Sequence, residues 1–290
     1  MIARPSYGGE REPDSHPTPG PPTFVQSARV QLVPLRRSSA AEQPGGCPFS
    51  GYFSGVHLAG RPVESDLSAA GWLAAGLAPS DPPTVASLVP PVFAAYARVL
   101  HPAIRYDGDD DVEVRWSAVA ALNDRTAHRL MQWPAITGSW DFVGEDDQPE
   151  LWNDSPAEGH LLAPVAHRLA AVLAEHTAEP GDCWFGAWTD AAPGPGLLAL
   201  GPRTHRLVRG PIALAGANFV PEPEEQGPSL WFPADRAWCV VTDIDLMSTY
   251  VGGSAAAVAA VLDDDALEAW PAEPGDPVTP DSDPVNPPPE

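Results

Sequence analysis

WCVVTDIDLMSTYVGGSAAAV, residues 238–258, holds the signals of a strand, a turn and a helix in direct succession. Its apolar start is rich in β-branched residues and predicts a buried strand over residues 237–242. Asp243 and Asp245 follow at the exit of this strand, where α/β proteins often place their binding and catalytic groups. The stretch therefore predicts a sheet core and puts the first candidate site at a strand end.

The second half of this stretch predicts a turn that leads into a helix. Tyr250 precedes the pair Gly252 and Gly253, which favours a turn, and Ser254 is a good N-cap for a helix over residues 255–262. A glycine pair before a helix can bind an anion through its free amides. No Walker A loop or dinucleotide-binding fingerprint occurs, so a plain tight turn is the other interpretation. These four residues are candidates for binding a ligand or partner.

The first half of the chain favours helices. Apolar residues recur at helical spacing after Pro90 and Pro91, and Pro102 ends that pattern. Ser155 and Glu158 match a capping box. The predicted helices run over residues 92–100, from about residue 114, and from Ser155 with a kink or restart at Pro164.

Strands are predicted in the second half of the chain. Apolar runs bounded by Gly, Pro and Asp mark them. The predicted strands cover residues 183–189, one of the segments 197–200 and 204–208, residues 237–242, and an edge strand at 266–270. Helices come first and strands later, without regular alternation. We therefore expect an α+β fold whose second half forms a mainly antiparallel or mixed sheet.

Proline-rich segments border the predicted core. Residues 1–65 and 271–290 contain many prolines and little sustained apolar periodicity. Such segments cannot bury enough surface to offset chain entropy, so we expect both to be disordered. All ten tryptophans lie between Trp72 and Trp270. We therefore expect a single globular domain over residues 66–270.

The chain is strongly acidic, with a formal net charge of −23. Residues 66–290 hold 34 of its 39 acidic residues, and all sixteen basic residues are arginine, a bias typical of GC-rich bacterial coding. A negative field repels phosphate backbones and anionic membranes, so nucleic-acid binding and membrane binding are both disfavoured. We expect either a basic protein partner or a surface charged only for solubility.

Three isolated cysteines, Cys47, Cys183 and Cys239, lack the paired spacing of a zinc site or a disulfide framework. Cys183 and Cys239 lie in apolar runs, where thiols are usually inert core residues. The chain has neither a signal-like apolar segment after Met1 nor an apolar span of membrane length. We expect a cytoplasmic protein without a cofactor.

The strand followed by Asp243 and Asp245 resembles the nucleophile motif of haloacid-dehalogenase-type phosphatases. In that family the first Asp attacks phosphorus, and the second acts as acid and base beside magnesium. The resemblance covers a handful of residues; Met247 stands where the family has Thr or Val, and the chain has no lysine. A metal-dependent hydrolase or transferase using Asp243 and Asp245, with or without acids at 263–265, stays open as the alternative function.

The histidines do not form a recognisable metal motif. His160 and His167 share a helix face only if the helix continues through Pro164, and HExxH is absent. His176 suits a helix C-terminus, where the dipole favours a positive charge. We expect structural histidines and no metal site among them.

Three longer segments resemble uncharacterised proteins that are common in actinobacteria. The segments are HTAEPGDCWFGAW (176–188), WFPADRAW (231–238) and YVGGS (250–254). The similarity covers most of residues 90–270 and implies no particular activity. Within these segments Trp231, Asp235 and Arg236 are further candidates for binding a partner or ligand.

VPPVFAAY, residues 89–96, resembles the helix start of SUKH-type toxin-immunity proteins. Those are α+β binding modules whose acidic members neutralise toxins, so the resemblance implies a protein-binding role. Together with the charge, it leads us to expect a non-enzymatic cytosolic binding module with an acidic surface for a basic partner.

Overall fold

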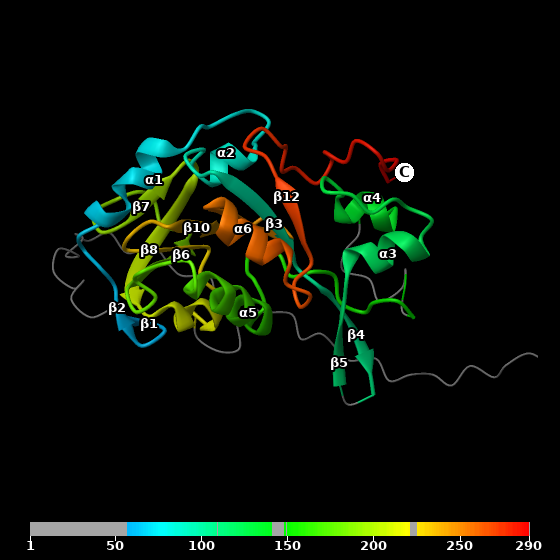
Figure 1. The fold of residues 1–290 in the computed structure, drawn as a ribbon, viewed down its shortest axis with the longest axis horizontal. Helices are drawn as coiled ribbons and strands as arrows, with labels where there is room; N and C mark the ends of the chain where they lie inside the picture. Colours follow the sequence, from blue (N-terminus) through cyan, green and yellow to red (C-terminus); the bar gives the residue numbers. More distant parts are fainter. Residues whose placement is uncertain (1–56, 109, 141–147, 149, 221–224, 290) are drawn as a thin grey trace, which may run out of the picture. The chain divides into compact units, whose positions relative to one another are not determined.

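A computed structural model describes residues 57–108, 110–140, 148, 150–220 and 225–289 of the chain (Figure 1). The disorder expected for the N-terminal residues falls, up to residue 56, outside these described residues. The helices are η1 Ser68–Ala70, α1 Gly71–Gly76, α2 Val85–Leu88, α3 Trp116–Leu122, α4 Trp133–Thr137, α5 Ala163–Ala174, η2 Ile212–Gly216 and α6 Ala255–Leu262. The strands are β1 His57–Leu58, β2 Arg61–Pro62, β3 Ala95–Leu100, β4 Ala103–Asp107, β5 Asp110–Val114, β6 Cys183–Thr189, β7 Leu198–Leu200, β8 Arg203–Gly210, β9 Leu230–Pro233, β10 Trp238–Val241, β11 Ser248–Gly253 and β12 Ala269–Ala272.

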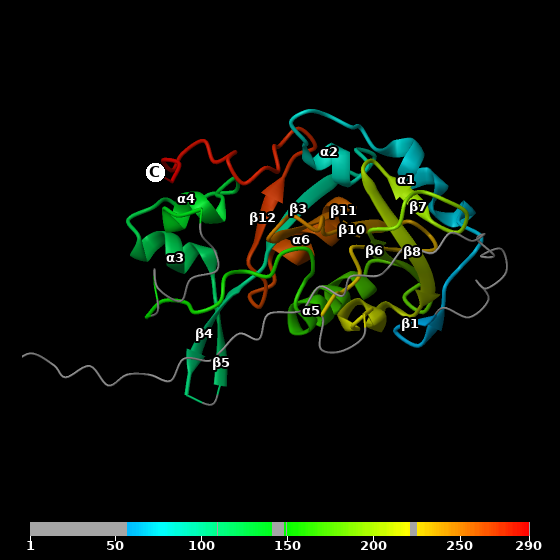
Figure 2. The ribbon, with the colours of Figure 1, turned by 180° about the vertical axis from the view of Figure 1, so that it is seen from behind.

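An eight-stranded antiparallel sheet forms the centre of the fold. Its order is β12-β3-β11-β10-β9-β6-β8-β7, and Figures 1 and 2 show β12 and β7 at its opposite edges. Every neighbouring pair is antiparallel. The sheet and the helices confirm the expected α+β class, with most strands of the sheet in the second half of the chain.

Both faces of the sheet are covered. Along β6, Cys183 and Phe185 point into a core cluster with α5, α6 and η2, because side chains alternate across a strand. Trp184, between them, points to the other face and joins a second cluster with α1, α2 and Val278. The second face carries the candidate site described below.

A third cluster lies beside the sheet and contains α3 and α4 (Figure 1). The Trp133 ring lies 5.3 Å from both the Trp116 and the Trp152 rings, measured between centroids. Both short helices thus bury their tryptophans, and the predicted helix near residue 114 is confirmed. β4 and β5 form a separate hairpin that extends away from the sheet (Figure 1).

The helix predicted over residues 92–100 is wrong, because Ala95–Leu100 is strand β3. β3 pairs with β11 on one side and with β12 on the other, and the side chains of Tyr96 through Leu100 are buried. A strand buried on both faces lacks the apolar–polar alternation that marks a half-exposed strand. Its apolar residues therefore matched helical spacing by coincidence.

The helix predicted to start at Ser155 begins instead at Ala163, with Leu162 as its N-cap. Backbone groups before that point are engaged in tertiary contacts. His101 donates to the Ala157 carbonyl at 2.6 Å, and the Gly159 amide donates to the Leu246 carbonyl at 3.0 Å. These bonds hold the segment in a non-helical form, and the predicted restart at Pro164 falls in the first turn of α5.

The remaining predicted helices and strands agree with the structure. β6 has the predicted bounds 183–189, and both alternative segments after it are strands, β7 and β8. α6 has the predicted bounds 255–262, and the Ser254 side chain caps it by accepting from the Ala257 amide. β12 is the expected edge strand, shifted to Ala269–Ala272.

The described residues at both borders of the predicted domain are ordered parts of the fold. The hairpin of β1 and β2 precedes Glu64, whose amide donates to the Leu207 carbonyl at 2.8 Å. The expected disorder of residues 271–290 does not hold for 271–289, because Asp276, Val278 and Asn286 are buried there. No helix among the described residues is long and apolar enough to cross a membrane.

Candidate functional site: a cavity over the sheet

Asp243 and Asp245 both pair with Arg203, the first residue of β8. The Arg203 Nε donates to Asp243 Oδ2 at 3.0 Å, and its Nη2 donates to Asp243 Oδ1 at 2.9 Å and to Asp245 Oδ2. The bond to Asp243 is the main cause that raises the pKa of Arg203 above its ordinary value. The two carboxylates therefore neutralise a guanidinium, and no group of three or more His, Cys, Asp and Glu in the described residues is arranged to hold a metal.

The expected turn at Gly252 and Gly253 is wrong, because both belong to β11. In the register of the sheet, Gly253 is opposite Trp238 and Gly252 is opposite Cys239, at the start of β10. Asp243 follows the other end of β10. The structure therefore places the glycine pair and the two carboxylates at opposite ends of β10.

The remaining predicted site residues have structural roles. Tyr250 and Trp231 are buried, and Trp231 stacks on Phe185 with 6.4 Å between ring centroids. Asp235 accepts hydrogen bonds from the Thr177 hydroxyl at 2.9 Å and from the amides of Ala178 and Ala237. Arg236 has a positive φ of 58° and lies over the Trp72 ring at 5.6 Å. None of these residues lines the cavity described next.

Asp243 and Asp245 lie at a cavity of about 490 Å³ on the second face of the sheet. This sheet cavity is bounded on one side by β7, β8, β9 and β10, with Trp188 of β6, and on the other by the segment from α1 to α2. Its lining is mostly apolar, with Leu77, Leu88, Leu200, Leu230 and Val278 among the contributing residues. The volume lies within the ~300–1,000 Å³ that is typical of small-molecule sites.

Two side-chain atoms in the cavity wall, His205 Nδ1 and Ser229 Oγ, have no hydrogen-bond partner among the described residues. The His205 ring also has a hydrogen bond to the backbone of Leu198, which opposes the effect of burial on its pKa. His205 is 6% exposed and Ser229 is 2% exposed, so bulk water does not satisfy either atom. Burial lowers the pKa of His205 to about 4, which leaves its imidazole neutral at pH 7. The cavity therefore offers neutral hydrogen-bonding groups deep in an apolar wall.

A third polar side chain of the wall, Thr242, belongs to a buried hydrogen-bonded chain. Its Oγ1 lies 2.7 Å from Thr249 Oγ1, which lies 2.9 Å from His101 Nε2. Burial lowers the pKa of His101 to about 4, and its Nδ1 faces the Ala157 carbonyl, which can only accept. The imidazole is therefore neutral with the proton on Nδ1, so Nε2 accepts from Thr249, and Thr249 accepts from Thr242. Because the Thr242 hydroxyl proton is donated to Thr249, the Thr242 oxygen can only accept a further hydrogen bond.

The C-terminal segment completes the cavity wall with Val278, Thr279 and Pro280. Two anchors hold it on either side. Before the wall, Asp276 pairs with Arg129, and its carbonyl accepts from the Val85 amide of α2 at 3.0 Å. After the wall, Asp283 is the second anchor.

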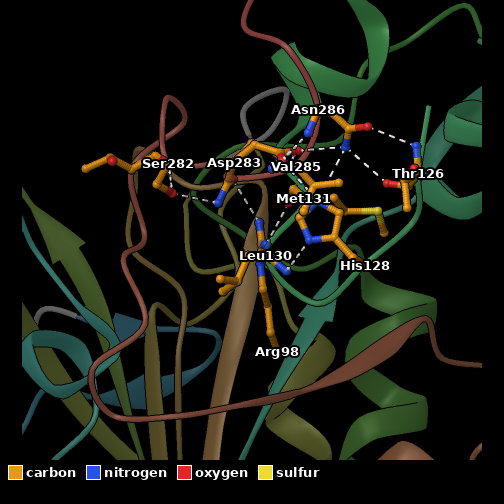
Figure 3. Close-up of polar contacts among 11 residues, drawn as sticks. Arg98, Thr126, His128, Leu130, Met131, Ser282, Asp283, Val285 and Asn286 are labelled. Carbon is orange, nitrogen blue, oxygen red and sulfur yellow. Dashed lines mark hydrogen bonds and ion pairs between the residues drawn. The ribbon is translucent and has the colours of Figure 1, made fainter.

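Asp283 binds the connection between α3 and α4 (Figure 3). Its carboxylate accepts from His128 Nε2 at 2.9 Å and from the Gln132 amide at 3.2 Å, and also from the Asn286 amide and side chain. Burial alone would raise the pKa of Asp283, but the hydrogen bonds from Asn286 and from the amides of Val285 and Gln132 hold it below its ordinary value. Asn286 in turn bonds the backbone of Thr126 in both directions.

The two described cysteines are unsuited to nucleophilic chemistry. Burial raises the pKa of Cys183 to about 12, and it raises the pKa of Cys239 as well. Both thiols therefore stay protonated at neutral pH, as expected for core residues. They are free rather than joined in a disulfide.

Sequence reasoning found Asp243 and Asp245 but missed Arg203, His205 and Ser229. These three belong to no motif and come from segments that are distant in sequence from the two carboxylates. The one signal is that Arg203, His205 and Leu207 are spaced two apart, so they would share one face of a strand that begins one residue before the predicted segment 204–208. That signal has meaning only once the sheet order is known. No family model, no curated protein and no solved structure matches the chain.

Proposed function

We propose that this protein is a non-enzymatic binding module and that its ligand occupies the sheet cavity. The observation that carries the proposal is the pair of buried atoms without partners, His205 Nδ1 and Ser229 Oγ, in the wall of a mostly apolar cavity. A buried polar group without a partner costs about 1–3 kcal/mol. A bound ligand that satisfies both groups would recover part of that free energy.

Several features favour binding over catalysis. His205 Nδ1 and Ser229 Oγ do not hydrogen-bond to each other, so they do not form an activated nucleophile. The alternative, a metal-dependent hydrolase or transferase using Asp243 and Asp245, requires both carboxylates to leave Arg203. No observation in the described residues favours that alternative.

A direct test is the binding of N-phenyl-1-naphthylamine, an uncharged dye that fluoresces in apolar sites. We expect saturable binding at one site in the wild type. Leu200→Trp, which fills the cavity from the edge strand β7, should abolish it, whereas Val92→Trp at an exposed position outside the lining should not. Absence of saturable binding in the wild type, or equal binding by both variants, would refute the proposal.

We also propose a basic protein partner for the acidic surface, with an immunity-like role in the cytoplasm. The support is the net charge of −23, together with the exposed side chains of Asp107, Asp111 and Glu113 on the β4–β5 hairpin. Free thiols at Cys183 and Cys239 suit a reducing compartment. The same charge supports the absence of nucleic-acid and membrane binding.

Affinity capture with the tagged chain tests this second proposal. We expect captured proteins of high isoelectric point that elute between about 0.1 and 0.5 M salt, where screening acts on surface charges. The double variant Asp111→Asn, Glu113→Gln should capture less than a control with Glu175→Gln and Asp281→Asn, which removes the same charge elsewhere. Capture that does not depend on salt or on the hairpin would contradict it.

A further inference from the structure

We infer that the ligand of the sheet cavity is an uncharged small molecule with an apolar body and one hydroxyl or carboxamide group. This inference rests on the proposed binding function and specifies the chemistry of its ligand. It is drawn from three properties of the wall: which groups lack partners, in which direction they can hydrogen-bond, and which charges surround the cavity.

The unpartnered groups require a ligand that both donates and accepts hydrogen bonds. The Ser229 hydroxyl can do either. The neutral His205 ring also has a hydrogen bond to the Leu198 backbone, and its Nδ1 is a donor in one tautomer and an acceptor in the other. The Thr242 oxygen, at the end of the chain through Thr249 to His101, is left as an acceptor. A hydroxyl or carboxamide group matches this set, because each of these groups carries both a donor and an acceptor.

The charges of the lining disfavour an anionic ligand. Arg203 is the only cation among the described lining residues, and it is already bound by both Asp243 and Asp245. Arg203, Asp243 and Asp245 together carry one net negative charge. A ligand carboxylate or phosphate in the cavity is therefore repelled and finds no free guanidinium. Fatty acids and phosphorylated ligands are therefore poor candidates.

A fully buried cation is also disfavoured, because both carboxylates of the lining, Asp243 and Asp245, are already paired with Arg203. His205 and Ser229 are neutral, and an ammonium group that leaves water for an apolar cavity loses its solvation without an ion pair. Asp245, whose side chain is 72% exposed, is the more accessible of these carboxylates, so a ligand ammonium is favoured only near solvent. An uncharged polar group is the chemistry that fits the buried part of the cavity.

The test compares three eight-carbon ligands that differ only in the head group: octan-1-ol, octanoate and octylammonium. Each is titrated at pH 7 against wild-type protein carrying N-phenyl-1-naphthylamine, and displacement gives its Kd. We expect octan-1-ol to bind about tenfold more tightly than octanoate, with octylammonium between them. In Asp245→Asn, which removes the excess negative charge, the difference between octan-1-ol and octanoate should shrink.

Two variants then test the hydrogen-bonding groups. His205→Phe and Ser229→Ala should each weaken octan-1-ol about fivefold, the loss of one neutral hydrogen bond, while the dye still binds. Thermal melts and the near-ultraviolet signal of the tryptophans confirm that each variant is folded. The comparison of head groups on the wild type does not depend on any variant and stands if one fails to fold.

The outcomes separate this inference from the proposed function. Octanoate binding as tightly as octan-1-ol, or octan-1-ol affinity unchanged in both folded variants, would overturn the ligand class while the cavity remains a binding site. Failure of the dye to bind the wild type would overturn the proposed function itself. The expected order of head-group affinities, together with weaker octan-1-ol binding in both variants, supports both the ligand class and the proposed function.

Discussion

Arg203 and Asp243 form a two-bond ion pair across the sheet, with 3.0 Å between Nε and Oδ2 and 2.9 Å between Nη2 and Oδ1. Arg203 begins β8 and Asp243 follows β10, although β9 and β6 lie between these strands. The pair therefore ties together two parts of the sheet that do not hydrogen-bond to each other. Both residues line the cavity, so the pair also sets its charge.

Removing Asp243 should destabilise the protein more than removing Asp245. The Asp243 side chain is 13% exposed, and its loss would leave a mostly buried guanidinium short of two charged hydrogen bonds, so Asp243→Asn should cost on the order of 2 kcal/mol. Asp245 is 72% exposed, and Asp245→Asn should change the free energy of unfolding by less than about 0.5 kcal/mol. Urea melts measure both values, and equal costs would contradict the assigned geometry.

Divalent cations should not stabilise the protein specifically. With Arg203 bound to both carboxylates, the site already holds its counter-charge. Millimolar Mg²⁺ or Ca²⁺ should therefore raise the melting temperature no more than NaCl of equal ionic strength, which screens the net charge. A gain of several degrees that is specific to a divalent ion, and that Asp243→Asn and Asp245→Asn both erase, would revive the metal-dependent alternative.

Gly252 and Gly253 should respond very differently to alanine. A Cβ on Gly252 would lie 2.5 Å from Phe93 Cδ2 and 2.8 Å from Val89 Cγ1, closer than atoms can approach. On Gly253 the nearest atoms are the Cβ atoms of Ala257 and Trp238 at 3.4 Å, an ordinary contact. We expect Gly252→Ala to cost about 1–3 kcal/mol in urea melts and Gly253→Ala clearly less. The reverse order would show that β11 does not pack as described.

Asp283 should anchor the C-terminal segment. Its side chain is 3% exposed and accepts from His128, Gln132 and Asn286, so Asp283→Asn should cost about 2–3 kcal/mol. Asp281→Asn, two residues away at an exposed position, is the matched control and should be nearly neutral. Protease cleavage after Leu267 that is faster in Asp283→Asn alone would show local release of the segment.

The protein should lose stability in mild acid because of two buried histidines. His101 and His205 titrate near pH 4 in the folded state, whereas an exposed histidine titrates near 6.5. Between these values the unfolded chain binds the extra protons, so stability is complete above about pH 6.5 and declines as the pH falls toward 4. Each histidine accounts for about 3 kcal/mol over this window.

Urea melts at several pH values test this origin of the acid sensitivity. His205→Phe should reduce the decline between pH 6.5 and 4 by roughly half, because His101 remains. Val92→Phe, at an exposed position with no titratable group, is the control and should leave the decline unchanged. A decline that begins only below pH 4, or one that His205→Phe leaves intact, would contradict the assignment.

The predictable parts of the fold were those with strong local signals. β6 has a continuous apolar run, and Ser254 is followed by an alanine-rich segment, so strand and helix were recognisable with accurate bounds. The prediction for β3 was wrong because the partners of this strand on both sides, β11 and β12, come from the last fifth of the chain. Pairing of that kind overrides local periodicity and leaves no trace within the strand itself.

The C-terminal segment and the cavity could not be predicted for related reasons. The proline content of residues 271–289 indicates disorder, but Asp283 and Asn286 give that segment a set of polar anchors. The cavity joins Arg203, His205 and Ser229 with residues from four other segments of the chain. A polar atom without a partner is a property of the assembled structure, and no single segment encodes it.

The late position of the partners of β3 also affects how the chain folds during synthesis. Arg98 of β3 donates to the Ser248 hydroxyl of β11, 150 positions later in the chain. β6 and β8, by contrast, pair from Thr189 and Thr204 onward and can form as soon as they leave the ribosome. The apolar strand β3 must therefore wait, unpaired, until β11 and β12 emerge. Delay of this kind slows folding and exposes a strand edge to aggregation, so translation speed and chaperone supply should govern the yield of folded protein.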